Sequence, residues 1–99
     1  VDKQPLLRYN NIRKGKVIQM KDKLKEFFET ELHYTKIGLE HETDPKRRSD
    51  IVWYARQRGV GASEFAQLFG LPYKEAEDVF NWYCDELKGM EEDVKMCGQ

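Results

Sequence analysis

The stretch from Gly59 to Tyr83 most narrowly limits what this chain can fold into, because it predicts two helices joined by a tight corner. We expect Gly70 to end the first helix, since glycine adopts the left-handed backbone region without a Cβ penalty. The Leu71 side chain is then expected to be buried inside the corner. Pro72 cannot continue the first helix, but proline suits the start of the second.

The residues on either side of this corner have the spacing of a helix-turn-helix unit. Ala66 stands where the first helix must let the second approach closely. The second helix is expected to bury one side, formed by Ala76, Val79, Phe80 and Tyr83. We place the first helix of the unit at about residues 62–69.

The last helix, from about residue 73, has a seam of apolar residues at intervals of four, three, four, three and four. Such a seam is typical of a helix that packs along another helix. Two interpretations are open: a neighbouring helix of the same chain fills the seam, or a second copy does so in a homodimer formed through the C-terminal helix. The seam consists of Ala76, Phe80, Tyr83, Leu87, Met90 and Val94.

Upstream of the corner, the pattern predicts two more helices. A long N-terminal helix over roughly residues 16–34 is indicated by apolar residues at helical spacing, and Ile37-Gly38-Leu39 is either its last turn or a loop. A second helix is expected to begin at Asp44 and Pro45, a capping residue followed by a first-turn proline, and to stop at Gly59. Gly59-Val60-Gly61 is interpreted as a flexible joint. The apolar positions of the long helix are Val17, Met20, Leu24, Phe27, Phe28 and Leu32.

The expected fold is therefore all-α, with one helical domain over residues 16–99. Residues 1–15 lack helical periodicity and contain Pro5 and Gly15, so we interpret them as an irregular basic arm. The chain has no apolar run long enough to cross a bilayer and no secretory pattern at its start. Its two cysteines, Cys84 and Cys97, are too few for a disulfide framework, which favours a cytoplasmic protein with free thiols.

Charge is distributed unevenly along the chain, although the whole chain carries a net charge of only -1. Residues 1–25 contain eight basic and two acidic residues, whereas residues 73–99 contain three basic and eight acidic ones. This asymmetry predicts two differently charged surfaces. The alternative is that the two segments face each other or the solvent.

The sequence contains no pattern typical of a catalytic site. His33 and His41 have no Ser, Cys or Asp partner at a spacing that would build a nucleophile, and surface positions explain both. No phosphate-binding glycine motif and no isolated carboxylate pair are present. Neither cysteine has a His or Cys at metal-ligand spacing. We expect no enzymatic activity, no cofactor and no metal.

Nucleic-acid binding is the first functional hypothesis. The helix after the corner begins with Tyr73 and Lys74 but continues with three carboxylates, which phosphates would repel, so it is a poor reader of bases. Cations elsewhere favour contact with the phosphate backbone by the arm and by a stripe on the helix from Pro45, formed either by Arg48 with Arg56 or by Arg47 with Arg58. Two aromatic residues are available to stack on bases. The alternative is that Trp53 belongs to the core and that the cations are only solvated. The candidate residues are Arg8, Arg13, Lys14, Lys16, Lys46, Arg47, Arg48, Trp53, Tyr54, Arg56 and Arg58.

The segment from residue 31 to residue 95 resembles part of the fingers of family A DNA polymerases, the bacterial repair-polymerase type. That family has a Tyr-Gly pair, a short helix ending in Ala-x-x-x-Gly-Ile, then x-x-x-Glu-Ala and a later Tyr. The triplet Glu31-Leu32-His33 is also similar to an acidic-Ile-His triplet of the family. The matching positions downstream are Gly59, Ala66, Gly70, Leu71, Lys74, Glu75, Ala76, Tyr83 and Gly89.

The positions that the resemblance would assign to polymerase chemistry differ in this chain. Lys46 stands where the family has a triphosphate-binding Arg, and Asp50 stands where it has an essential Lys. Tyr54 takes the place of the ring that stacks on the nucleotide, and Arg58 replaces the Tyr before the Gly. The metal-binding aspartate motifs of the palm are absent. The resemblance therefore implies DNA association and not polymerisation.

A small non-enzymatic, DNA-associated accessory or regulatory protein is the function that the sequence favours. The alternative is a protein-interaction module that inhibits or regulates a larger machine through an acidic C-terminal helix. The residues of that helix that would bind the partner are Glu75, Asp78, Asp85, Glu86, Glu91, Glu92 and Asp93.

Overall fold

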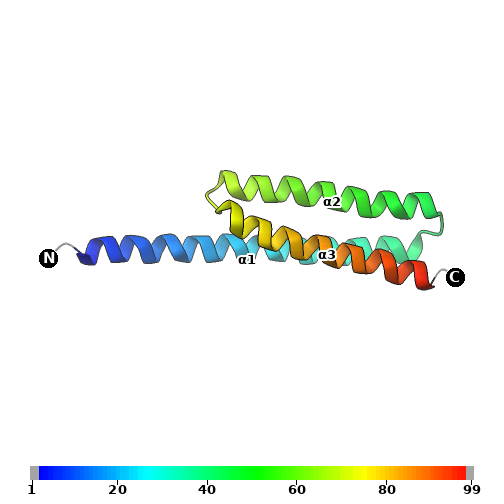
Figure 1. Cartoon of the computed structure of the whole chain (residues 1–99), viewed down its shortest axis with the longest axis horizontal. Helices are drawn as coiled ribbons and strands as arrows, with labels where there is room; N and C mark the ends of the chain where they lie inside the picture. Colours follow the sequence, from blue (N-terminus) through cyan, green and yellow to red (C-terminus); the bar gives the residue numbers. More distant parts are fainter. Residues whose placement is uncertain (1–2, 98–99) are drawn as a thin grey trace.

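A computed structural model describes the backbone of residues 3–97 and the side chains of residues 14–92. It contains three α-helices and no strand within the described backbone: α1 (Lys3–His41), α2 (Pro45–Leu68) and α3 (Tyr73–Cys97). Each helix packs against the other two, and neighbours in sequence run antiparallel (Figure 1). The predicted all-α fold is confirmed. The molecule is a rod of 69 × 20 × 17 Å, and none of its described helices has an apolar stretch able to cross a lipid bilayer.

Helix α1 is longer than the sequence pattern predicts. It begins at Lys3, within the segment that we expected to be irregular, and ends at His41, so Ile37-Gly38-Leu39 belongs to its last turns and not to a loop. Pro5 lies in the first turn, where its missing N–H is not required, and an interior glycine costs a helix only about 1 kcal/mol. At the other end, burial of Leu39 holds the last turns against the rest of the bundle.

Helix α2 begins where the sequence predicts. Asp44 has an extended backbone, and its side chain accepts a hydrogen bond from the backbone N–H of Lys46 at 3.2 Å, while Pro45 is the first helical residue. The expected joint at Gly59-Val60-Gly61 is wrong, because α2 continues through it to Leu68. The short helix expected over residues 62–69 is therefore the last part of α2.

Gly59 is a close-contact residue and not a hinge. It is buried in the interior of α2, and a Cβ atom there would lie 2.6 Å from Cε2 and 2.9 Å from Cδ2 of Tyr83. The missing side chain is what allows the Tyr83 ring to lie against the backbone of α2.

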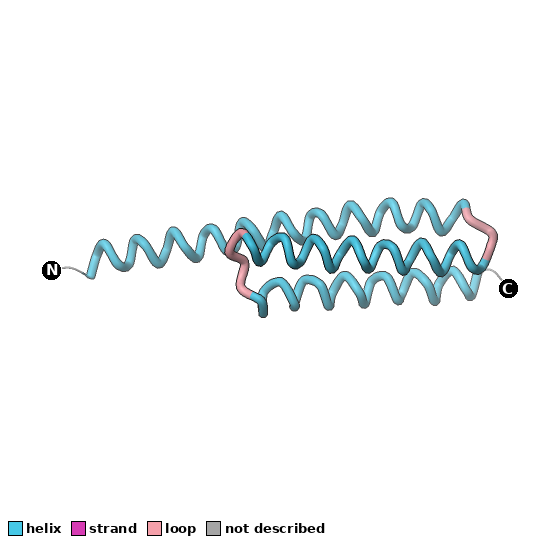
Figure 2. The backbone as a smooth tube through the Cα atoms, turned by 90° about the horizontal axis from the view of Figure 1, so that it is seen from above, coloured by secondary structure: helices cyan, strands magenta, loops and turns pink. Residues whose placement is uncertain are grey.

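The corner between α2 and α3 has the predicted residues in the predicted roles. Gly70 has a φ of 109°, its N–H donates to the Gln67 carbonyl, and the Leu71 N–H donates to the Ala66 carbonyl, each at 3.0 Å. Leu71 is only 2% exposed. Beyond the corner, however, α2 and α3 lie side by side along their lengths instead of crossing (Figures 1 and 2). The corner thus closes an α-helical hairpin.

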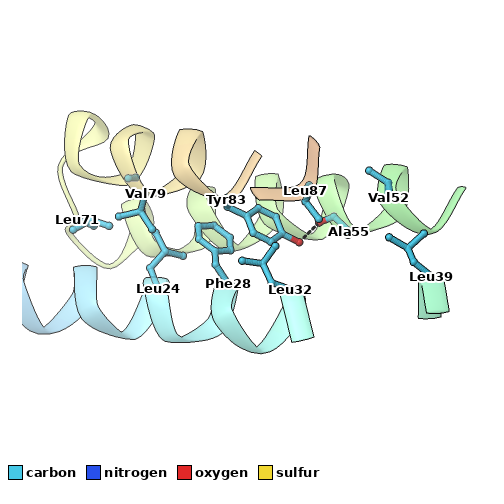
Figure 3. Close-up of a cluster of buried hydrophobic side chains, with 11 residues drawn as sticks. Leu24, Phe28, Leu32, Leu39, Val52, Ala55, Leu71, Val79, Tyr83 and Leu87 are labelled. Carbon is cyan, nitrogen blue, oxygen red and sulfur yellow. Dashed lines mark hydrogen bonds between the residues drawn. The ribbon is translucent and has the colours of Figure 1, made fainter. Parts of the chain in front are cut away.

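The core forms one continuous cluster along the axis of the rod (Figure 3). At its centre Phe28 of α1 and Tyr83 of α3 stack with ring centroids 4.3 Å apart, and the Tyr83 hydroxyl donates to the Ala55 carbonyl of α2 at 2.8 Å. Ala76, Tyr83 and Leu87 are fully buried in this cluster. Helices of the same chain therefore fill the α3 seam at these positions, and the Val94 side chain lies outside the described residues.

Candidate interaction surface

An open groove of about 950 Å³ runs between α1 and α2 on the side of the bundle that α3 does not cover. Its lining is mostly apolar. Helix α1 contributes Lys16, Gln19, Met20, Lys23, Leu24 and Phe27. Helix α2 contributes Arg58, Gly61, Ala62, Phe65, Ala66 and Phe69. The sequence patterns mark seven of these residues, but for other roles: Lys16, Met20, Leu24, Phe27, Arg58, Gly61 and Ala66.

Three phenylalanine rings of the groove are exposed to solvent. Phe65 and Phe69, one turn apart on α2, are 62% and 68% exposed, and their ring centroids are 4.8 Å apart. Phe27 of α1, one of the apolar residues at helical spacing, is 41% exposed, whereas its neighbour Phe28 is buried and packs against Phe80 and Tyr83 of α3. Exposed aromatic groups gathered in one concave place are typical of a protein-binding surface.

Small residues form the rest of the α2 side of the groove. Ala62 and Ala66 pack partly on the core, while Gly61 is exposed. A Cβ atom built on Gly61 meets nothing within 4 Å, in contrast to Gly59 two residues earlier. No described contact within the chain requires glycine at position 61, although glycine weakens a helix interior.

The ionisable residues that line the groove are all cations, namely Lys16, Lys23 and Arg58. The Arg58 Nε donates to the Glu31 carboxylate of α1 at 2.8 Å, so its charge is already partly balanced. Both lysines are exposed to solvent. The groove therefore has an apolar floor and a net positive rim.

The cations of α2 lie on more than one side of the helix. Arg58 points to α1, whereas the Arg56 guanidinium lies beside the Cys84 thiol on α3. Residues two apart on a helix project in nearly opposite directions, about 200° apart. Arg48 Nη1 donates to the Glu42 carbonyl in the α1–α2 loop, and Arg47 lies 3.8 Å from Asp44. Lys46 is exposed at the start of the helix.

Trp53 and Tyr54 are both more than half exposed, and their rings meet edge to face at 5.0 Å. The alternative that Trp53 belongs to the core is therefore wrong. Of the predicted arm cations, Lys14 and Lys16 are exposed on α1. The side chains of Arg8 and Arg13 lie outside the described residues.

The acidic residues of α3 fall into two groups. Asp78, Asp85 and Glu92 recur every seven residues and are exposed along the outer side of the helix, and Glu86 is also exposed. Glu75 instead accepts a hydrogen bond from Lys21 of α1 at 2.6 Å, which raises the pKa of that lysine. Glu91 is half-buried, and the Asp93 side chain lies outside the described residues.

The described histidine and cysteine side chains do not lie together in one site. His33 and His41 are exposed on α1. Burial raises the pKa of the Cys84 thiol, and the neighbouring Arg56 opposes that rise. Among the described residues, no three His, Cys, Asp or Glu side chains are grouped as metal ligands. The Cys97 side chain is not described.

The sequence patterns alone did not predict the groove, because they mark neither Phe65 nor Phe69 as a site residue. A signal for it is present. Both residues lie in the helix predicted before the corner, three and seven positions after Ala62. On that helix they lie on the flank of the core-facing side and not at its centre. Apolar residues in excess of a helix's core stripe indicate a second contact surface.

Comparisons of the chain with protein-family models, with curated proteins and with solved structures find no match.

Proposed function

We propose that this protein is a non-enzymatic, cytoplasmic protein-interaction module that regulates a larger partner. This function belongs to the class that the acidic helix suggested, but the contact surface we propose is the groove between α1 and α2. The observation that carries it is the exposure of Phe27, Phe65 and Phe69 in one concave, mostly apolar place.

The hydrophobic effect, which also drives folding of the chain, favours burial of these rings by a partner. Apolar surface removed from water contributes about 25 cal/mol per Å², and aromatic residues are enriched among those that dominate binding energy. The acidic line of Asp78, Asp85 and Glu92 on α3 lies on a separate surface. We assign it a steering role, since exposed charge accelerates encounter with a basic partner more than it adds affinity.

Site-specific photo-crosslinking tests this proposal. A photoreactive phenylalanine analogue at Phe65 of the full chain is expected to give a discrete protein adduct in cells that contain the natural partner. Tyr54 is the matched control, because it is similarly exposed on the same helix but does not line the groove. Equal adducts at both positions, or no protein adduct at Phe65, contradict the proposal.

DNA association is the second candidate function. It is favoured by the exposed lysines Lys14, Lys16 and Lys23 on the part of the chain that is richest in basic residues, and the resemblance to the polymerase fingers agrees with it. A gel-shift series with duplex DNA is expected to show affinity that falls steeply with salt. A Lys14→Glu/Lys16→Glu variant should lose this binding, whereas Lys46→Glu, away from this cluster, should retain most of it. Absence of a shift at low salt removes this candidate.

A further inference from the structure

We propose that the groove between α1 and α2 binds a single amphipathic helix of the partner protein, with acidic residues beside its apolar face. The bound helix completes a four-helix bundle. This inference rests on the proposed function and specifies the chemistry of the partner.

The dimensions of the groove fit a helix. Its lining spans residues 16–27 of α1 and residues 58–69 of α2, which are antiparallel. Each range covers eleven steps along the helix, which at 1.5 Å each give about 16 Å, or about three helical turns. A helix of that length presents apolar side chains at positions i, i+3 or i+4, and i+7 to such a surface. Phe27 and Phe69 would contact opposite ends of that face, and Phe65 would contact a position between them.

The floor permits close approach of a helix backbone. Packed helices lie about 8–10 Å apart, and small residues at the contact favour the short end of that range. Ala62 and Ala66 are small and partly covered, and Gly61 leaves open space where a side chain would stand. A partner helix lying over Gly61 gives this interior glycine the packing role that its own chain does not supply.

Charge selects the occupant. Because α1 and α2 are antiparallel, Lys16 lies toward the Phe69 end of the groove and Arg58 toward the Phe27 end, with Lys23 between them along α1. Arg58 is engaged by Glu31, so Lys16 and Lys23 are the cations that a bound helix meets. Carboxylates flanking its apolar face complement them, whereas lysines there would be repelled.

A second copy of this chain fits the groove poorly. The outer side of α3 presents Asp78, Asp85 and Glu92 where an apolar face is required. Residues 1–25 include the part of α1 that extends beyond the other two helices (Figure 1) and carry a net charge of +6. In a second copy this segment would be repelled by the cations that line the groove. The occupant that the observations favour is therefore a helix of another protein.

The test uses a fluorescent synthetic peptide of about 18 residues, which is long enough to form a helix when a covalent link between two side chains holds it in that conformation. Leucines form its apolar face and glutamates flank it, and a twin peptide has lysines in place of the glutamates. We expect the acidic peptide to bind the full chain about tenfold more tightly than its twin in fluorescence anisotropy. In the Lys16→Glu/Lys23→Glu variant the preference should reverse. Equal affinity for both peptides overturns the charge argument.

Gly61→Leu tests the place of binding. A leucine there enters open space in the free protein but obstructs the groove, so peptide affinity should fall at least tenfold while the thermal unfolding midpoint does not decrease. Gln57→Leu is the matched control, because it adds the same side chain to an exposed position of α2 outside the groove. Unchanged affinity in Gly61→Leu overturns the proposed site.

Other occupants give distinct results, each of which overturns the inference. A dimer in sedimentation that Gly61→Leu dissociates identifies a second copy as the occupant. Saturable binding of oleate or of a single-stranded oligonucleotide that displaces the peptide identifies a lipid or a nucleic acid. The proposed function is judged separately. If Phe65 crosslinks to a protein but the crosslinked segment is not an acidic helix, the inference fails and the interaction module stands. Absence of any adduct at Phe65 removes the function itself.

Discussion

Two glycines of α2 show how strongly the effect of one residue depends on its surroundings. Gly59 lies under the Tyr83 ring, and a Cβ atom added to it would lie only 2.6 Å from the nearest ring carbon. A Cβ atom added to Gly61 would enter open space. Both stand in the interior of the same helix, so their intrinsic helix propensities are equal. Their substitutions should therefore change stability in opposite directions.

Gly59→Ala is expected to destabilise the protein by about 1–3 kcal/mol, because the added methyl group overpacks a core without space for it. Gly61→Ala should instead stabilise it by about 0.5–1 kcal/mol through reduced backbone freedom in the unfolded chain. Urea unfolding of the two variants beside the unsubstituted chain measures both effects. A stabilising Gly59→Ala would contradict the close contact with Tyr83.

Tyr83 gives a prediction for alkaline pH. Burial raises the pKa of its hydroxyl to about 12 from an ordinary value of 10. Below pH 10 the hydroxyl is protonated in both the folded and unfolded states. Between pH 10 and 12 the unfolded state loses this proton first, so stability falls as pH rises, by at most about 1.4 kcal/mol per pH unit.

Tyr83→Phe isolates this contribution from the other groups that titrate at high pH. The variant should be about 1 kcal/mol less stable at pH 7, because the hydrogen bond to the Ala55 carbonyl is lost. Its disadvantage should shrink between pH 10 and 12, since phenylalanine has no proton to lose. Denaturant unfolding at several pH values measures the difference, and a gap that is constant across this range would contradict the buried neutral hydroxyl.

At the scale of the elements, the α2–α3 corner determines how the hairpin closes. Gly70 holds a φ of 109°, a conformation that a residue with a Cβ rarely adopts, and the backbone bonds of Gly70 and Leu71 satisfy the last carbonyls of α2. The space around Gly70 is open, so backbone strain alone should decide the effect of a substitution there.

Gly70→Ala is expected to cost about 1–3 kcal/mol through this strain. Gly15→Ala is the matched control, because Gly15 is likewise free of neighbours within 4 Å but lies in a helix, where alanine is favoured. Thermal unfolding should show a lower midpoint for the first variant and no decrease for the second. Equal midpoints would mean that the corner relaxes without cost.

At the scale of the whole molecule, one core joins all three helices. Phe28 of α1, Ala55 of α2 and Tyr83 of α3 are each fully buried and in one cluster (Figure 3). Since every helix contributes to the same cluster, no pair of helices retains a complete core without the third. The bundle should therefore unfold in a single transition.

Phe28→Ala should cost about 3–5 kcal/mol, a large part of the 5–15 kcal/mol that typically stabilises a domain. Phe27→Ala, one residue earlier and 41% exposed, should cost much less while weakening binding in the groove. Circular dichroism and tryptophan fluorescence should report the same unfolding midpoint in each variant. Separate transitions, or equal costs for both substitutions, would contradict a shared core centred on Phe28.

Signals that act within a few residues were sufficient to predict the all-α class, the start of α2 and the α2–α3 corner, but not the full length of α1 or the continuity of α2. Asp44 caps its own helix, and Gly70 and Pro72 limit their own backbone, so their effects are local and can be recognised in the sequence. The α3 seam also predicted its buried side, because helical spacing alone places Ala76, Tyr83 and Leu87 together.

Contacts between helices determined the rest. Gly59 and Gly61 have the same local signal, and only the position of the Tyr83 ring makes the first a core contact and leaves the second in a groove. The groove likewise depends on which flank of α2 the other two helices leave uncovered. The surroundings of Arg56 and Arg58 depend on the partners that α3 and α1 place beside them. Such relations join residues far apart in the chain, so no spacing within one helix contains them.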